Sequence, residues 1–141
     1  MGRVRRLAAG LAAGAMGLLA VGAAAAQADG YVYLQCDFPA ASSGQGATSD
    51  QLKIGRGDWF SMNAEKGAWG SSLCRTDFSA NYRGECSFTG TKFELVATSG
   101  SAKQTTTINR TDGTIVRQSA ESRITGACKA IPPPATRPRQ P

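Results

Sequence analysis

The sequence predicts an all-β domain: a single small antiparallel meander, closed into a barrel or a two-sheet sandwich and held by two disulfides. From residue 29 onward, short apolar runs alternate with Gly, Ser, Asn and Asp, and no long stretch has the 3.6-residue periodicity of a helix. Four cysteines occur in this short region. Barrel and sandwich stay open as alternatives, because about eight short strands of this kind build either one.

The expected strands follow from alternation of apolar and polar residues. In the first strand, Val32, Leu34 and Cys36 share one face, and the intervening tyrosines take the other. Turns are predicted at residues 55–57, which read Gly-Arg-Gly, and at residues 111–113, whose Thr-Asp-Gly is the strongest hairpin signal. The strands are expected at residues 31–36, 51–54, 58–62, 73–78, 82–88, 92–98, 105–110, 114–118 and 123–129.

Residues 1–28 have the layout of a cleavable secretory signal peptide. Three arginines precede an uncharged segment rich in Ala, Leu and Gly, which ends in the A-x-A cleavage sequence of residues 26–28. An uncleaved membrane anchor is the alternative, but the segment is rich in Ala and Gly rather than in Leu and Ile. We therefore expect a β-domain at residues 29–131, a Pro- and Arg-rich disordered tail at 132–141, and a periplasmic or secreted location.

Signal cleavage also changes the charge of the protein. The full chain carries a net charge of +6, but three of its basic residues leave with the signal and two more, Arg137 and Arg139, lie in the tail. The folded part is therefore close to neutral. This balance argues against a nucleic-acid partner, and no membrane anchor is expected after cleavage.

The four cysteines are expected to form two disulfides. Cys74 and Cys86 are equally distant from Ala80, so a hairpin centred there would place them opposite each other. Cys36 and Cys128 would then join the first strand to the last. A zinc site is disfavoured, because zinc-binding cysteines come in close Cys-x-x-Cys pairs and these do not.

The chain contains no histidine, which removes Ser-His-Asp and Cys-His catalysis and imidazole metal sites. We predict no catalytic residue, no metal and no cofactor. Paired carboxylates, as in glycoside hydrolysis, are the one enzymatic arrangement left open. The scattered candidates are Asp58, Glu65, Asp77, Glu85, Glu94, Asp112 and Glu121.

Trp59 and Trp69 are the side chains best suited to contact a partner. Because side chains alternate along a strand, Trp59 and its neighbour Phe60 cannot both point inward. One belongs to the core, and the other is exposed or covered by the loop at residues 63–72, which carries Trp69. Trp69 either folds back over the core or remains partly exposed, where an aromatic ring can anchor a protein or stack on a sugar.

The C-terminal third of the chain resembles small exported proteobacterial proteins of unknown function. The resemblance rests on residues 107–113, which read TINRTDG, on residues 124–128, which read ITGAC, and on the Pro- and Arg-bearing end. The shared pattern is I-x-R-x-x-G followed by G-x-C. It implies an exported β-domain and no activity, and it carries no site residue.

Two functions are compatible with these features. The first is a non-enzymatic binding or interaction module that uses the Trp59 and Trp69 region on an envelope protein or glycan. The second is a small carboxylate-dependent hydrolase that acts on cell-envelope glycans. Two carboxyl groups about 5–9 Å apart in one cleft would favour the enzyme.

Overall fold

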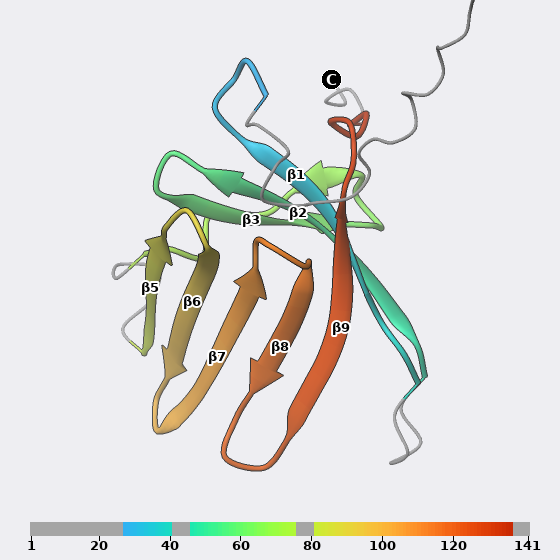
Figure 1. Ribbon diagram of the computed structural model, residues 1–141. Helices are drawn as coiled ribbons and strands as arrows, with labels where there is room; N and C mark the ends of the chain where they lie inside the picture. The colour runs from blue at the N-terminus through green and yellow to red at the C-terminus, as the bar shows by residue number, and fades with distance from the viewer. Residues whose placement is uncertain (1–26, 41–45, 76–80, 137–141) are drawn as a thin grey trace, which may run out of the picture.

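The computed structural model describes residues 27–40, 46–75 and 81–136, which contain no helix and nine antiparallel strands in one sheet (Figure 1). The strand order is β4-β3-β2-β1-β9-β8-β7-β6-β5. The strands are β1 (Val32–Phe38), β2 (Thr48–Gly55), β3 (Asp58–Asn63), β4 (Ala68–Trp69), β5 (Tyr82–Phe88), β6 (Lys92–Ser99), β7 (Ala102–Asn109), β8 (Thr114–Gln118) and β9 (Arg123–Ala130). The all-β prediction is therefore confirmed.

The sheet consists of two meanders joined at their inner edges. Strands β1 to β4 form one meander and β5 to β9 the other, and the first and last strands pair with each other at the centre. In that pairing Cys36 lies directly opposite Cys128. The first and last strands thus meet in the middle of the sheet, while β4 and β5, from the middle of the chain, form its outer edges.

The sheet curls into a half-barrel (Figure 1). The two meanders, β1–β4 and β5–β9, form its two arms and share one core. Trp59 of β3 and Phe93 of β6 come from opposite arms, yet both belong to a single buried cluster. The fold is therefore a half-barrel and not a two-sheet sandwich, because one continuous sheet encloses the core. The buried cluster contains Val32, Leu34, Cys36, Phe38, Leu52, Ile54, Trp59, Phe93, Leu95, Ile108, Ile115 and Cys128.

Two predicted turns are confirmed. Between β2 and β3, Arg56 and Gly57 both have positive φ values, 55° and 83°, as a two-residue type I′ hairpin turn requires. Gly113, with a φ of 80°, precedes β8 in the second turn. Glycine adopts this left-handed conformation without the steric cost that a Cβ atom brings.

The gap between the arms is spanned by residues 70–75, which are not a strand. On one side the Leu73 N–H donates to the carbonyl oxygen of Trp59 in β3, at 2.8 Å. On the other side the Gly84 N–H of β5 donates to the carbonyl oxygen of Arg75, at 2.6 Å. A Cβ atom on Gly84 would lie 1.7 Å from the Leu73 carbonyl oxygen, so only glycine allows this close approach.

The strand predicted at residues 73–78 requires a correction. Residues 73–75 are not in a strand, and residues 76–78 lie outside the described part of the chain. Strand β5 instead pairs with β6, where Cys86 faces Leu95. The alternation of this segment resembles a strand, but its backbone bonds to β3 as well as to β5, and single-strand periodicity does not reveal that.

Both predicted disulfides are present. Cys36 bonds to Cys128 across the central strand pair, and Cys74 bonds to Cys86, which fastens the spanning segment to β5. The second pairing is correct although the hairpin that predicted it is not formed as expected. Residues 74 and 86 are close because the spanning segment runs beside β5.

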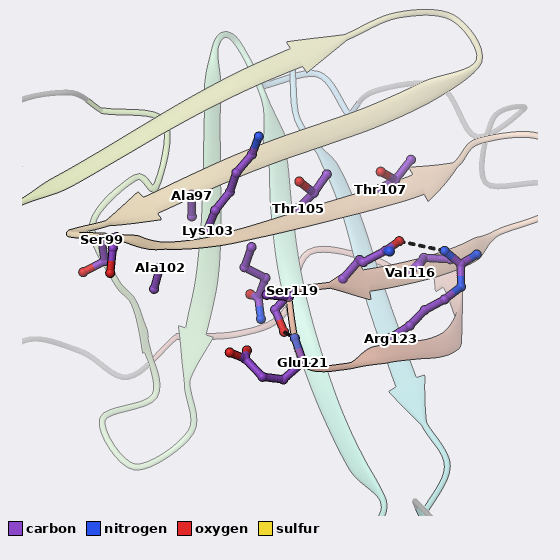
Figure 2. A pocket seen from close by; sticks show the side chains of 14 residues that line it. Ala97, Ser99, Ala102, Lys103, Thr105, Thr107, Val116, Ser119, Glu121 and Arg123 are labelled. Atoms are coloured by element: carbon purple, nitrogen blue, oxygen red, sulfur yellow. Dashed lines mark hydrogen bonds between the residues drawn. The ribbon is translucent and has the colours of Figure 1, made fainter.

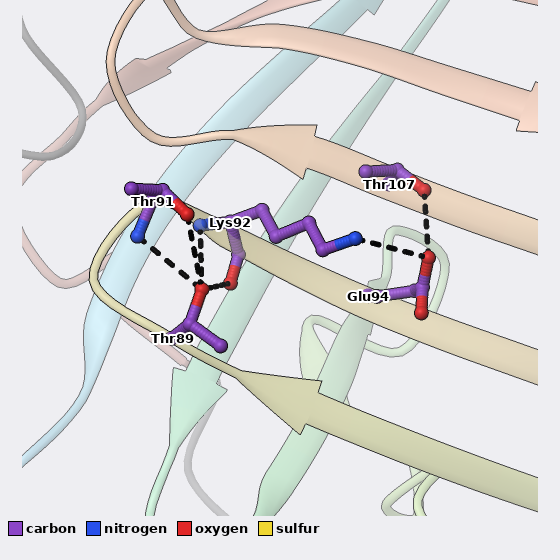
Figure 3. Close-up of polar contacts among 5 residues, drawn as sticks. All are labelled: Thr89, Thr91, Lys92, Glu94 and Thr107. Carbon is purple, nitrogen blue, oxygen red and sulfur yellow. Dashed lines mark hydrogen bonds and ion pairs between the residues drawn. The ribbon is translucent and has the colours of Figure 1, made fainter.

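Hydrogen bonds to the side chain of Thr89 stabilise the turn between β5 and β6 (Figure 3). The Thr89 hydroxyl oxygen accepts the N–H groups of Thr91 and Lys92, at 3.3 and 3.1 Å. Further along β6, Glu94 pairs with Lys92 at 3.7 Å and accepts the Thr107 hydroxyl of β7 at 3.5 Å. The Thr89 bonds thus fix the β5–β6 turn, and the Thr107 bond links β6 to β7.

Candidate functional site

The structure places the two tryptophans on opposite faces of the sheet. Trp59 is 2 % exposed and belongs to the core, so a partner cannot reach it. Trp69 is half-buried in β4, a short strand within the predicted loop, and lies beside Tyr33 with ring centroids 6.1 Å apart. Trp69 thus covers the buried Tyr33 on the face opposite the main core but stays partly exposed, so of the two predicted residues it is the one available for contact.

Strand register gathers further aromatic side chains around a lysine on the face of Trp69. Lys53 of β2 lies directly opposite Tyr33 of β1 on one side and opposite Phe60 of β3 on the other. The two-residue turn at Arg56 and Gly57 fixes the second of these pairings. Tyr31, just before β1, packs edge-on against Phe60 with ring centroids 6.2 Å apart.

The lysine ammonium group lies over three rings. The Lys53 Nζ atom is 4.8 Å from the centroids of Tyr31 and Phe60 and 5.4 Å from that of Trp69. Each distance is within the range of a cation–π interaction, worth about 0.5–1 kcal/mol at an exposed site. We call Tyr31, Tyr33, Lys53, Phe60 and Trp69 the aromatic–lysine cluster.

The Asp29 carboxylate is hydrogen-bonded to both tyrosines of the cluster. The Tyr33 hydroxyl donates to Asp29 Oδ2 at 2.6 Å, and the Tyr31 N–H donates to Asp29 Oδ1 at 3.1 Å. The bond from Tyr33 lowers the pKa of Asp29, while burial and this bond raise the pKa of Tyr33 to about 12. The carboxylate is thus ionised and the phenol protonated at neutral pH.

Sequence reasoning singled out Trp69 but missed the lysine at the centre. The alternation in β1 placed the tyrosines on the face opposite the core, as observed, and Phe60 was recognised as one of two candidates for that face. Lys53 carried no signal of its own. The predicted turn at residues 55–57 is the one signal that pointed to Lys53, because a two-residue loop there pairs Lys53 with Phe60.

A polar groove of about 1120 Å³ lies between the tips of two hairpins, β6–β7 and β8–β9 (Figure 2). Strand β7 pairs with β8 only from Thr105 to Ile108, so the tips separate beyond Thr105. The lining residues include Lys103, Gln104, Thr105, Gln118, Glu121 and Arg123. Arg123 Nη1 donates to Gln118 Oε1 at 2.8 Å.

The carboxylates offer little for hydrolytic chemistry. Glu121 is the only carboxylate among the described residues that line the groove. The resolved pKa shifts of Asp29, Asp37 and Asp112 are all downward, because each carboxylate accepts hydrogen bonds. A general acid for glycoside hydrolysis needs a raised pKa instead. Asp77, one of the predicted candidates, lies outside the described residues.

Metal ligands do not cluster in the described ranges: no group of three or more Asp, Glu or Cys residues there could hold an ion. The same part of the chain has no helix with the length and apolar character of a membrane span.

In comparisons with known proteins, no family model, no curated protein and no solved structure matches the chain. The resemblance to exported proteobacterial proteins therefore stays a prediction. The residues that carry it have structural roles in this fold. Ile108 is fully buried, and Arg110 stacks 4.4 Å from the Phe93 ring centroid and donates to the Thr89 carbonyl oxygen at 2.6 Å.

The remaining residues of that pattern are also explained by packing. Gly113 supplies a turn conformation, and its carbonyl oxygen accepts the Cys128 N–H at 2.7 Å. Gly126 lies under Phe38, where an added Cβ atom would be 2.8 Å from the ring. Cys128 forms the central disulfide. The pattern thus describes a way of building the sheet and gives no support to a catalytic role.

Proposed function

We propose that this protein is a non-enzymatic binding module that contacts a component of the cell envelope, a protein or a glycan, through the aromatic–lysine cluster. The observation that carries the proposal is the gathering of three half-buried rings, from Tyr31, Phe60 and Trp69, around one lysine on the sheet face opposite the core. Aromatic rings that remain accessible on a sheet are common anchors of partner contacts.

An extracytoplasmic location supports this proposal. The two disulfides are consistent with an oxidising environment, extracellular or periplasmic. We propose that residues 1–28 are removed as a signal peptide. Among the described residues, the Asp29 side chain bonds to Tyr31 and Tyr33, which follow it in the chain, so cleavage before Asp29 would leave these contacts with the cluster intact.

Capture from an envelope extract tests the binding function. The mature protein is immobilised, and the bound material is analysed for both protein and carbohydrate. Trp69→Ala should reduce capture by roughly tenfold or more, as expected when a central aromatic anchor is truncated. Phe88→Ala is the matched control, because Phe88 is another half-buried aromatic residue, located at the far edge strand β5.

The two variants separate binding from folding. Both should lose some thermal stability, and only Trp69→Ala should lose capture while keeping a cooperative unfolding transition. Equal capture by wild type and Trp69→Ala, or equal losses in both variants, would refute a role for the cluster.

A further inference from the structure

The aromatic–lysine cluster presents positive charge rather than a site for a cation. An aromatic ring is negative on its face and positive at its edge. Lys53 Nζ already lies over the faces of Tyr31, Phe60 and Trp69, within 5.4 Å of every centroid. A cationic ligand would have to displace this ammonium group, whereas an anionic group would be attracted to it.

Arg56 adds a second, positioned cation. Its guanidinium carbon lies 5.8 Å from the Tyr31 ring centroid, and its Nη1 atom donates a long hydrogen bond, 3.5 Å, to the Asp29 carbonyl oxygen. The aliphatic part of the side chain packs over Gly30, where an added Cβ atom would lie 3.1 Å from Arg56 Cδ. The arginine is thus held against Tyr31, the ring that also contacts Lys53, although its side chain is exposed.

Neither cation is neutralised by an ion pair with another described residue. The Asp29 carboxylate accepts hydrogen bonds from Tyr33 and from the Tyr31 backbone, and it also attracts Lys53 electrostatically without forming an ion pair with it. Lys53, Arg56 and the Asp29 carboxylate together carry a net charge of +1. Charge complementarity therefore points to an anionic ligand.

The size of the surface favours a small ligand unit over a protein. One side of a stable protein interface buries about 800 Å², and the half-buried side chains of Tyr31, Lys53, Phe60 and Trp69 expose much less than that. An extended peptide could instead add to a sheet edge, but the edge strand here, β4, has only 2 residues. A small flat group such as a single sugar ring matches this exposed area better than either.

We propose that the ligand is an acidic polysaccharide, with a sugar carboxylate at Lys53 and Arg56 and the C–H face of the sugar against the exposed surfaces of Phe60 and Trp69. This inference rests on the proposed binding function. The carboxylate supplies charge-assisted contacts to the two cations, and the aromatic surfaces receive the apolar face of the same sugar ring.

Binding of the mature protein to polygalacturonate, measured by calorimetry or affinity electrophoresis, tests the proposal. Dextran serves as the neutral polysaccharide and polyglutamate as a non-saccharide polyanion. Lys53→Met keeps the apolar length of the side chain but removes its charge, and should weaken polygalacturonate binding by roughly tenfold or more. Lys103→Gln is the matched control, because Lys103 carries the same charge but lines the distant groove.

Selective binding of polygalacturonate that falls with Lys53→Met and with Trp69→Ala, but not with Lys103→Gln, supports the proposal. Equal Lys53-dependent binding of polyglutamate would overturn the saccharide assignment, and a loss in Lys103→Gln alone would place the site in the groove. If envelope capture depends on Trp69 while polygalacturonate does not bind, the acidic-polysaccharide inference fails and the binding function stands.

Discussion

The two disulfides should contribute unequally to stability, because they close loops of very different length. Cys36 and Cys128 are 92 residues apart in sequence, and Cys74 and Cys86 are 12 apart. In the chain-entropy model, closing these loops in the unfolded chain stabilises the native state by about 4.6 and about 2.9 kcal/mol at 25 °C. The difference of about 1.7 kcal/mol is large enough to measure.

The test replaces each pair by alanine and compares the two variants with the oxidised wild type by equilibrium urea unfolding. Cys36 is fully buried and Cys128 nearly so, whereas Cys74 and Cys86 are half-buried. Loss of buried sulfur adds a cavity cost to the first variant and widens the gap. The slope of the transition should also rise more in that variant, because its unfolded chain expands further.

A loss in the Cys74→Ala, Cys86→Ala variant that equals or exceeds that of the Cys36→Ala, Cys128→Ala variant would refute this reasoning. It would show that fastening the spanning segment at residues 70–75 matters more than constraining the unfolded chain.

Three further predictions follow from other contacts. Gly84→Ala should lower the melting temperature by several degrees, because its Cβ atom would overlap a backbone carbonyl oxygen. Gly90→Ala is the control and should leave the melting temperature unchanged, because no atom lies within 4 Å of its Cβ position. Equal effects of the two substitutions would contradict this reasoning. The hydrogen bond from Tyr33 lowers the pKa of Asp29. The contribution of this bond to the free energy of unfolding is therefore complete above about pH 4 and is lost as the pH falls through the lowered pKa. Asp29→Asn should therefore flatten the dependence of urea stability on pH between about 2 and 5, and an unchanged profile would count against the pairing. Deleting residues 132–141 should leave the melting temperature nearly unchanged, and a fall of several degrees would show that the tail docks.

Local signals in the sequence predicted most of the strands. Strand β8 has the predicted bounds, because a Thr-Asp-Gly turn precedes it and its own alternation is clear. Strand β4 was missed, because two residues that pair with the end of β3 leave no periodic signal. Residues 73–75 were misassigned, because their partners lie on two different strands and depend on the absence of a side chain at Gly84.

The candidate site was only partly predictable for a similar reason. Trp69 could be singled out as a large aromatic residue in a loop. The position of Lys53 among the rings depends on the register of β1, β2 and β3 together, which no single strand specifies. Residues that act through cross-strand neighbours become visible only when the pairing of the strands is known.

The central pairing of the first strand with the last has a consequence for how the molecule is made. As the chain emerges end-first from a ribosome or a membrane channel, β1 must wait for β9, which is the final strand to appear. Until β9 appears, the edge of β1 that pairs with β9 has no hydrogen-bonding partner, and the apolar face of β1–β4 is not fully covered. We expect completion of the core to follow the emergence of β9, and a molecule interrupted before β9 to be prone to association through that open edge.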